Sequence, residues 1–385
     1  MKKEMTSRQR QINAIRGKEV DRIPCSPRIG AYLKSRYLSH GVETVINFNK
    51  IYKHDPVYQM MPGLVNPVDS VYFDSSYTKD IKVDYKETAN GEMKIVERTI
   101  STPAGKLKDI IHVPPSNGKY GVTPNPVKRE FLIKDASDIE KLRYVLPDPK
   151  KHLNLVNFNE TEDKLKNEGL TQLFLRSPLD HLAGDARGIE NLMIDYYDNM
   201  ELFDKIMDFF TEYVMDTTKV CLEKGVVNFF VSWYYSSLST GWSPEILRQK
   251  FIPVLRKHID LIHSYDATYD FYDDGKMMDI LEDYISCKPD VIETLTPPTV
   301  GDIDLVKAKK LAGDKVTLKG YVDIIYVMQK GTAKDVRDTV IDALSICAPN
   351  GRFILGSSDS FREGTPEINI KTYFDTAMEY GSRFL

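Results

Sequence analysis

The sequence predicts an α/β fold: a (β/α)₈ TIM barrel with an inserted antiparallel β-meander. Short apolar runs alternate with amphipathic helical patterns from residue 170 onward, which indicates a parallel sheet. Between residues 81 and 113 the hydrophobic period changes to two, and Asn90-Gly91 lies between alternating runs, which is a strong hairpin signal. We therefore expect one domain over residues 1–385, with the meander inserted at about residues 81–113.

The number of predicted strands is the third argument for a barrel. Eight parallel strands close such a barrel, and its active site lies at their carboxyl ends. An open doubly wound sheet is the alternative, but no Gly-x-Gly-x-x-Gly turn follows a strand to favour it. The eight runs begin near residues 23, 70, 172, 226, 268, 290, 316 and 352.

The helices between these strands carry the usual terminal signals. Thr6 or Ser7 can cap a first helix over 6–16. A long helix over 200–222 ends before Gly225, and Ser243-Pro244-Glu245 opens the next one. Further helical patterns lie near 42–48, 277–285, 304–311 and 336–346, and from 365 onward.

Composition excludes several classes of protein. The formal net charge of −4 argues against a nucleic-acid binder or a protein of anionic membrane surfaces. No apolar run approaches the roughly 18 residues of a membrane span, and no apolar segment follows the charged N-terminus as in a signal peptide. The four cysteines are scattered, which is typical of free thiols in a reducing compartment. We expect a cytoplasmic protein.

Candidate functional residues lie where the predicted strands end. The acidic turn Tyr272-Asp273-Asp274 and the strand-end Glu293 could act as acid and base, or could hold a divalent metal through oxygen ligands. An Asp-Asp-Gly turn that only caps the next helix is an equally good interpretation. The strand ends together supply Arg28, Asp74, Arg176, Trp233, Tyr234, Tyr235, Tyr272, Asp273, Asp274, Glu293, Tyr321, Asp323, Ser357 and Asp359.

The positive side chains leave two interpretations open. Arg28 and Arg176 could grip an anionic substrate, or could form structural ion pairs with Asp74 or Asp180. His181 is the histidine nearest the predicted rim, and it could equally satisfy local backbone groups. The histidines and cysteines show no zinc-binding spacing.

Several motifs follow one another in an order that points to a family. They are Lys18-Glu19-Val20-Asp21-Arg22-Ile23-Pro24, Ser243-Pro244-Glu245, Gly320-Tyr321-Val322-Asp323 and the stretch from Phe353 to Ile370. In this order the sequence resembles the uroporphyrinogen decarboxylase superfamily, especially its cobalamin-dependent (corrinoid) methyltransferase branch. The resemblance covers nearly the whole chain and implies a TIM barrel.

Departures from the family pattern bear on the chemistry. The decarboxylases carry a second arginine in the N-terminal loop, where Arg28-Ile29-Gly30-Ala31-Tyr32 has one, and a late histidine where Ser357-Ser358-Asp359 stands. The zinc-dependent methyltransferases carry His-x-Cys where this chain has Tyr272-Asp273-Asp274, and a cysteine after the last strand. Any zinc would therefore have non-thiol ligands, for which the hypothesis is Asp274, Glu293 and Asp359.

The resemblance implies transfer of a methyl group from a small methylated donor, such as an aromatic methyl ether, to a corrinoid protein. Self-association into a homo-oligomer is compatible with this. A decarboxylase for a different carboxylated substrate and a non-catalytic corrinoid- or tetrapyrrole-binding protein are the alternatives. The candidate catalytic residues are Asp274, Glu293, Tyr272 and Asp273, and the candidate substrate-binding residues are Arg28, Asp74, Arg176, Trp233, Tyr234, Tyr235, Tyr321, Asp323 and His181.

Overall fold

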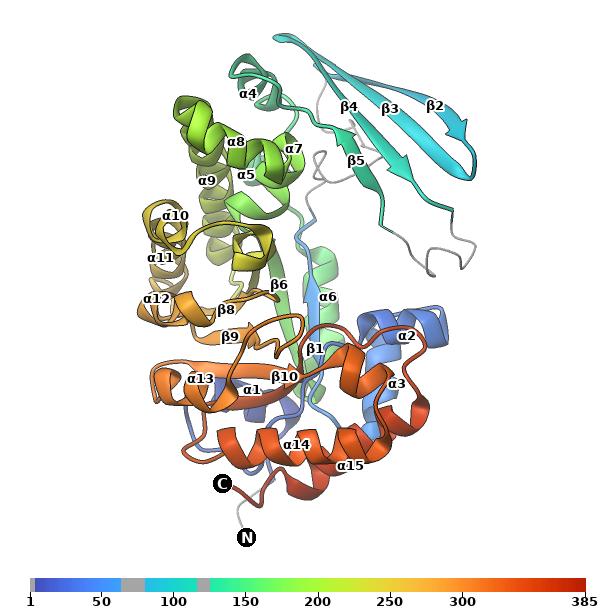
Figure 1. The fold of residues 1–385 in the computed structure, drawn as a ribbon, viewed down its shortest axis with the longest axis vertical. Coiled ribbons are helices and arrows are strands. Elements are labelled where there is room, and N and C mark those ends of the chain that lie inside the picture. Colours follow the sequence, from blue (N-terminus) through green and yellow to red (C-terminus); the bar gives the residue numbers. More distant parts are fainter. Residues whose placement is uncertain (1–3, 64–79, 116–124) are drawn as a thin grey trace. The chain divides into compact units, whose positions relative to one another are not determined.

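The computed structural model describes residues 4–63, 80–115 and 125–385 (Figure 1). The chain divides into two compact units. The first comprises Met1–Met61, Val156–Leu175 and Gly225–Leu385, and the second comprises Pro62–Leu155 and Arg176–Lys224. The organisation as one domain stays a prediction.

A curled, parallel, seven-stranded sheet forms the centre of the first unit. Its order is β1-β6-β7-β8-β9-β10-β11, so from β6 onward each strand lies beside the next strand in sequence. Strands that alternate with helices and pair in parallel in this way confirm the predicted α/β fold. The strands are β1 (Val57–Met60), β6 (Leu170–Arg176), β7 (Asn228–Ser232), β8 (Thr268–Tyr272), β9 (Val291–Thr294), β10 (Thr317–Val322) and β11 (Phe353–Ser357).

The closed eight-stranded barrel is not established by this sheet. Six of the eight predicted strands are present, from the one near residue 172 to the one near 352. The strand expected near residue 23 is a single bridge between Cys25 and Leu355, and the Asp55 amide donates a hydrogen bond to the Cys25 carbonyl. The strand expected near residue 70 lies outside the described residues. The sheet contains β1 instead, which sequence analysis missed because only four half-buried residues form it.

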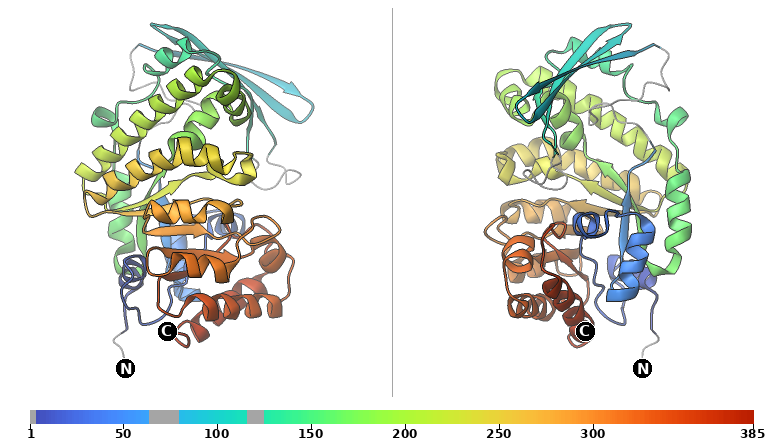
Figure 2. Two further views of the ribbon diagram at one scale, coloured as in Figure 1. Left: turned by 60° about the vertical axis from the view of Figure 1, so that its left-hand side comes forward. Right: turned by 90° about the vertical axis from the view of Figure 1, so that its right-hand side faces the viewer.

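Helices cover the outer face of this sheet, as Figures 1 and 2 show for the orange and red segments. The side chains of Thr6 and Thr332 cap the first turns of α1 and α14. The helices of the unit are α1 (Ser7–Ile15), α2 (Gly30–Tyr37), α3 (Val42–Tyr52), α6 (Val156–Leu165), α10 (Pro244–Ile246), α11 (Ile252–His263), α12 (Leu281–Ser286), α13 (Leu305–Ala312), α14 (Ala333–Cys347) and α15 (Glu367–Tyr380).

Helix α1 covers the amino-terminal end of the sheet. Ala14 and Ile15 pack with Leu170, Val291 and Ile354, which lie near the starts of three strands. The hydroxyl of Thr317 on β10 donates a hydrogen bond to the carbonyl of Ala14 at 2.7 Å. This end of the sheet is therefore apolar and closed by α1, and the polar interior lies nearer the carboxyl ends.

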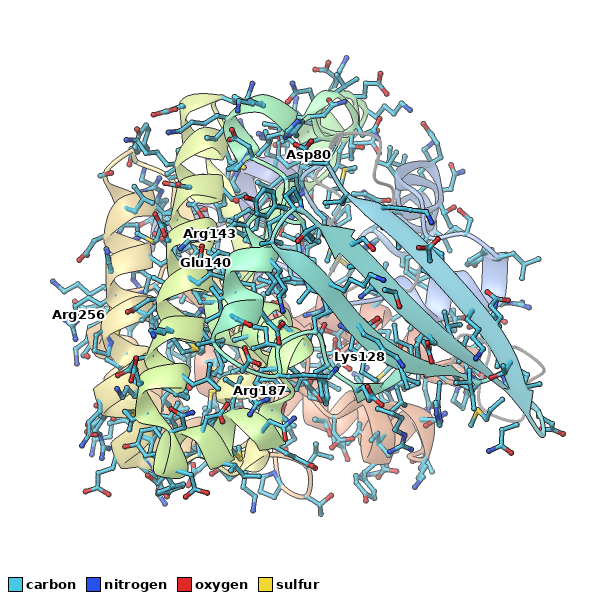
Figure 3. All side chains as sticks on the ribbon, turned by 90° about the horizontal axis from the view of Figure 1, so that it is seen from above. Asp80, Lys128, Glu140, Arg143, Arg187 and Arg256 are labelled. Carbon is cyan, nitrogen blue, oxygen red and sulfur yellow. The ribbon has the colours of Figure 1, made fainter. Side chains whose placement is uncertain are left out.

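The second unit contains the predicted meander. Its antiparallel sheet consists of β2 (Lys82–Asn90), β3 (Met93–Thr102), β4 (Gly105–Val113) and β5 (Val127–Glu130), so three strands fall where the alternating pattern predicts them. On its buried face the Arg98 Nε donates to Asp109 Oδ1 at 2.9 Å. Figure 3 labels Lys128 of β5, whose Nζ donates to the Asp185 carbonyl.

The helices of the second unit include the longest one in the described chain. α9 presents an apolar stripe that includes Phe203, Phe210 and Val214, and its opposite face is charged. Of the helices in the described ranges, none combines the length and apolar character that crossing a bilayer requires. The helices are α4 (Ser137–Leu142), α5 (Pro149–His152), α7 (Asp185–Arg187), α8 (Ile189–Asp198) and α9 (Met200–Glu223).

Candidate active site

Four strands of the parallel sheet each contribute one polar side chain to a buried layer. We call the set Gln172, Asp270, Glu293 and Lys319 the polar layer; each residue is at most 3 % exposed. The side chains of a strand alternate between its two faces, and Lys319 lies directly beside Glu293 in the β9–β10 register. The sheet therefore places ionisable groups in its interior, where burial is costly unless they are paired.

Lys319 lies between the two carboxylates of this layer. Its Nζ makes a short ion pair with Glu293 Oε2 and lies 3.7 Å from Asp270 Oδ2. Gln172 Nε2 donates to the same Asp270 oxygen at 3.0 Å, and Gln59 of β1 donates to Gln172 in turn. One cation thus serves two anions, and the layer carries an excess negative charge when both carboxylates are ionised.

This imbalance is reflected in the pKa values. Burial raises the pKa of Asp270 to about 7, and the charge of Glu293 adds to the rise, while Lys319 opposes it. For Lys319 burial acts to lower the pKa, but the two carboxylates outweigh burial and the pKa is raised overall. Lys319 is therefore a permanent cation at neutral pH, and Asp270 is the group that exchanges a proton.

Arg28 extends the polar layer toward the carboxyl ends of the strands. Its Nη1 lies 3.7 Å from Glu293 Oε1, and its Nε lies 4.0 Å from Asp359 Oδ1. The guanidinium carbon lies 4.4 Å from the ring centre of Tyr272 and 5.1 Å from that of Phe230, which is a cation–π arrangement. Among the described residues, neither Arg28 Nη1 nor Glu293 Oε1 has a hydrogen-bond partner. Both atoms are therefore available to a ligand.

The two aspartates of the acidic turn have different environments. Asp273 is fully buried and accepts hydrogen bonds from the Gly275 amide and the Tyr284 hydroxyl, so it closes the turn. It does not cap the next helix, because Asp302 accepts from the amides of Met277 and Met278 there. Asp274 accepts a hydrogen bond from the Tyr272 hydroxyl at 3.0 Å. Burial, followed by the charge of Asp359, raises the pKa of Asp274 to about 6. A carboxyl group with this pKa can donate a proton near neutral pH.

A cavity of about 460 Å³ adjoins Arg28 and Lys319. Tyr58 and Gln59 of β1 and Ser360 also line it, and the exposed Lys34 of α2 is part of its lining. This volume is within the range of small-molecule sites. The cavity therefore brings the buried Lys319 and the half-buried Arg28 together in the lining of a ligand-sized space.

Several predicted substrate-binding residues have contacts that do not involve the polar layer, Arg28 or the acidic turn. Trp233 donates from its indole nitrogen to the Tyr269 hydroxyl at 2.8 Å and belongs to the core. Asp323 accepts from the amides of Ile325 and Tyr326, and so caps the following turn. Tyr321 has Asp304 and Asp342 among its charged neighbours.

The remaining predicted substrate-binding residues are two tyrosines, Arg176, Asp74 and His181. Tyr234 and Tyr235 contact each other, with ring centres 4.9 Å apart, and Tyr234 is exposed. Arg176 ends β6 and is assigned to the second unit. Asp74 and the side chain of His181 lie outside what the structure describes.

Comparison with known proteins identifies the family. The sequence model described as uroporphyrinogen decarboxylase (URO-D) matches residues 117–380. The chain belongs to the uroporphyrinogen decarboxylase family.

A solved structure shares the fold of this family member. A methyltransferase from Methanosarcina mazei matches with a TM-score of 0.64 at 14% identity, covering 98% of this chain and 99% of that one. A B12-independent methionine synthase from Shewanella sp. W3-18-1 matches with a TM-score of 0.46 at 11% identity, covering 94% of this chain and 97% of that one. The comparison with curated proteins gave no match.

The described residues of this family member do not fit a zinc ion. Across the described ranges, no group of three or more His, Cys, Asp or Glu side chains is arranged to hold a metal. Of the three hypothesised ligands, Glu293 pairs with Lys319, Asp274 with Tyr272, and Asp359 with Arg362. All four cysteines are buried, and none belongs to the polar layer. We therefore propose no role for a metal ion in the reaction.

Sequence analysis missed Asp270, Lys319 and Gln172 because it considered the ends of strands. Each lies inside its strand, where a buried parallel strand ordinarily carries apolar residues. The available signal was a charged residue at an inward position, as in Thr-Tyr-Asp-Phe-Tyr of β8 and Thr-Leu-Lys-Gly-Tyr of β10. A charge there requires a partner across the sheet, so it marks an interior site.

Proposed function

We propose that this family member transfers a methyl group from a small methylated donor, for which an aryl methyl ether fits best, to a corrinoid protein. The observation that carries the proposal is the half-buried Asp274, which is hydrogen-bonded to the buried Tyr272 beside Arg28. Cleavage of an ether leaves an oxygen that must gain a proton. A carboxyl group with a pKa of about 6 is suited to donate it.

The roles of the residues follow from this geometry. In the reaction the bond between the methyl carbon and the ether oxygen breaks, and the electron pair stays on the oxygen. Asp274 donates its proton to that oxygen, and the Tyr272 hydroxyl positions the carboxyl group. Arg28, held by the rings of Tyr272 and Phe230, stabilises the negative charge that develops on the oxygen. The corrinoid supplies the acceptor for the methyl group.

The comparisons support this proposal at the level of the fold. The methyltransferase from Methanosarcina mazei aligns over almost the whole of both chains, at an identity that shows shared architecture alone. The choice of methyl transfer over other chemistry therefore rests on the site.

An uncharged ether fits the aromatic walls better than a quaternary ammonium donor. The faces of Tyr272 and Phe230 already hold the guanidinium of Arg28. A cationic donor would have to displace that charge, or lie beside it and be repelled. Trp233 offers no further aromatic wall here, because it is buried in the core and its indole nitrogen donates to the Tyr269 hydroxyl.

One observation favours decarboxylation as a second candidate function. Arg28 and Lys319 both line the cavity, and these two cations could hold the carboxylate of a substrate that loses carbon dioxide. The two functions differ in product, so a single incubation separates them.

The test incubates the protein with a reduced corrinoid protein and a set of aryl methyl ethers, and follows methylcobalamin by absorbance. Asp274→Asn should lower kcat by about 100-fold or more, because the proton donor is lost. Wild-type activity should fall as pH rises above about 6, since Asp274 must be protonated to act, and the variant should lack this dependence.

Asp279→Asn, which changes an exposed aspartate a few residues away, is the matched control and should act like wild type. Carbon dioxide release without methylcobalamin would support the decarboxylase instead. Full activity of Asp274→Asn would remove Asp274 from the mechanism.

A further inference from the structure

The polar layer carries more negative than positive charge when Asp270 and Glu293 are both ionised, and a bound anion would increase this imbalance. Four groups surround Asp270: Gln172 from β6, Glu293 from β9, Lys319 from β10 and, farther away, Arg28. Glu293 and Asp270 share Lys319, so two negative charges face one positive charge. An additional anion beside Lys319 would place three negative charges around it. In a buried site such an excess is strongly unfavourable.

A proton on Asp270 removes this obstacle. Lys319 and Glu293 then form a neutral ion pair, and Asp270 keeps its hydrogen bond from Gln172. The cations that line the cavity, Lys319 and Arg28, can then attract one further negative charge. Arg28 Nη1 has no hydrogen-bond partner among the described residues, so it can bind an anionic oxygen without first breaking a bond.

We propose that Lys319 binds the anionic group of the substrate and that this binding takes up one proton on Asp270. The inference deepens the proposed function and rests on it for the identity of the ligand, because the anion would belong to the methyl donor. The donor is then a carboxylated aryl methyl ether. The cavity of about 460 Å³ accommodates a single aromatic ring with its substituents.

The neighbouring acids do not replace Asp270 in this role. Asp274 and Asp359 interact with Arg28 on the side of Tyr272, and Glu293 keeps its short ion pair with Lys319. Asp270 is the group whose pKa of about 7 allows proton uptake near neutral pH. Binding should therefore be strongest below pH 7 and weaken as pH rises through that value, because the protonated form binds the anion.

The test uses benzoate, which has no methyl group to transfer, and its neutral analogue benzamide. Calorimetry at pH 6 and pH 8, in two buffers of different ionisation enthalpy, measures affinity and proton uptake together. With a pKa of about 7, benzoate should bind about 10-fold more weakly at pH 8 than at pH 6, with close to one proton taken up at pH 8. Benzamide should bind without proton uptake.

Three variants separate the contributions. Asp270→Asn, a close mimic of the protonated acid, should bind benzoate with no proton uptake and no pH dependence. Lys319→Met should weaken benzoate binding by about 10- to 100-fold, the loss of one charge-assisted hydrogen bond. Lys334→Met, at an exposed lysine of α14 that does not line the cavity, is the matched control and should leave binding unchanged.

The outcomes are independent of methyl transfer. Equal binding of benzoate and benzamide, or proton uptake that persists in Asp270→Asn, would overturn the inference even if the enzyme demethylates ethers. A larger effect of Lys334→Met than of Lys319→Met would also overturn it. If Lys319→Met does not fold, the proton uptake measured for benzoate binding to Asp270→Asn still tests the inference. The expected binding pattern without methyl transfer would uphold the anion site and refute the proposed reaction.

Discussion

Replacing Lys319 by methionine tests how the polar layer affects stability. Methionine approximates the length of lysine but removes its charge, leaving Asp270 and Glu293 buried without their cation. Removing one member of a buried ion pair costs about 3–5 kcal/mol. With a pKa of about 7, Asp270 gains a proton at little cost near neutral pH, so Glu293 carries most of the penalty. We expect a loss of about 3 kcal/mol at pH 7.5, the lower end of that range.

The penalty should depend on pH in a defined direction. Without Lys319, the pKa of Asp270 loses the positive charge that opposed its rise, so the variant gains stability as pH falls and loses it as pH rises. The loss relative to wild type should therefore be smaller at pH 5.5 than at pH 7.5. Urea unfolding followed by the fluorescence of the buried Trp233 and Trp242 measures it.

A second replacement identifies the cause. Lys319→Met combined with Glu293→Gln removes the orphaned charge and should recover about 2 kcal/mol of the loss at pH 7.5. Lys334→Met, at an exposed lysine of α14, is the control and should leave the unfolding midpoint unchanged. A cost below about 1 kcal/mol for the single variant, with no recovery in the double variant, would refute the reasoning.

Two further predictions concern the surrounding fold. Gly320→Ala should lower the free energy of unfolding by about 3 kcal/mol, because a Cβ atom at φ +134° would lie 1.8 Å from the Thr294 carbonyl oxygen. Gly313→Ala is the control, at positive φ but with no atom nearer than 4.0 Å, and should lower it by only about 1 kcal/mol. Equal urea midpoints for the two variants would contradict this prediction. Burial lowers the pKa of His54 to about 4, so the fold keeps it neutral and loses stability as pH falls from about 6.5 toward 4. The stability difference between wild type and His54→Leu should change by about 3 kcal/mol across that range, and a constant difference would exclude this role.

The alternation of strands and helices could be predicted from the sequence because it depends on the local pattern of apolar residues. β7 to β11 follow apolar runs of ordinary length, and Asn90-Gly91 marked the first hairpin of the meander. β1 was not readable, because four half-buried residues after Pro56 carry no periodic signal. The extended segment at Cys25 pairs with Leu355, which is far along the chain. No local pattern could therefore show that this segment forms a single bridge and not a strand.

Only part of the candidate site could be predicted from the sequence, because the rest depends on contacts between segments that are distant in the chain. Arg28, Tyr272, Asp274, Glu293 and Asp359 gather as strand-end residues should. Spacing could not separate Asp273 from its neighbour Asp274, since which carboxylate turns toward Tyr284 is decided by α12. Lys319 and Asp270 were passed over because a pairing across three strands becomes visible only when the register is known.

The hydrogen bond from Thr317 to Ala14 joins residues that are 303 positions apart. While the chain is being synthesised, α1 leaves the ribosome long before the strands that it will cover. Leu170, Val291 and Ile354 must all be in place before it can settle on them. We expect water to reach the lysine and its two carboxylates until β11 is added, so that these charges become buried in a late step. Hydrogen exchange on ribosome-stalled chains that end before and after residue 357 would show whether α1 becomes protected only in the longer one.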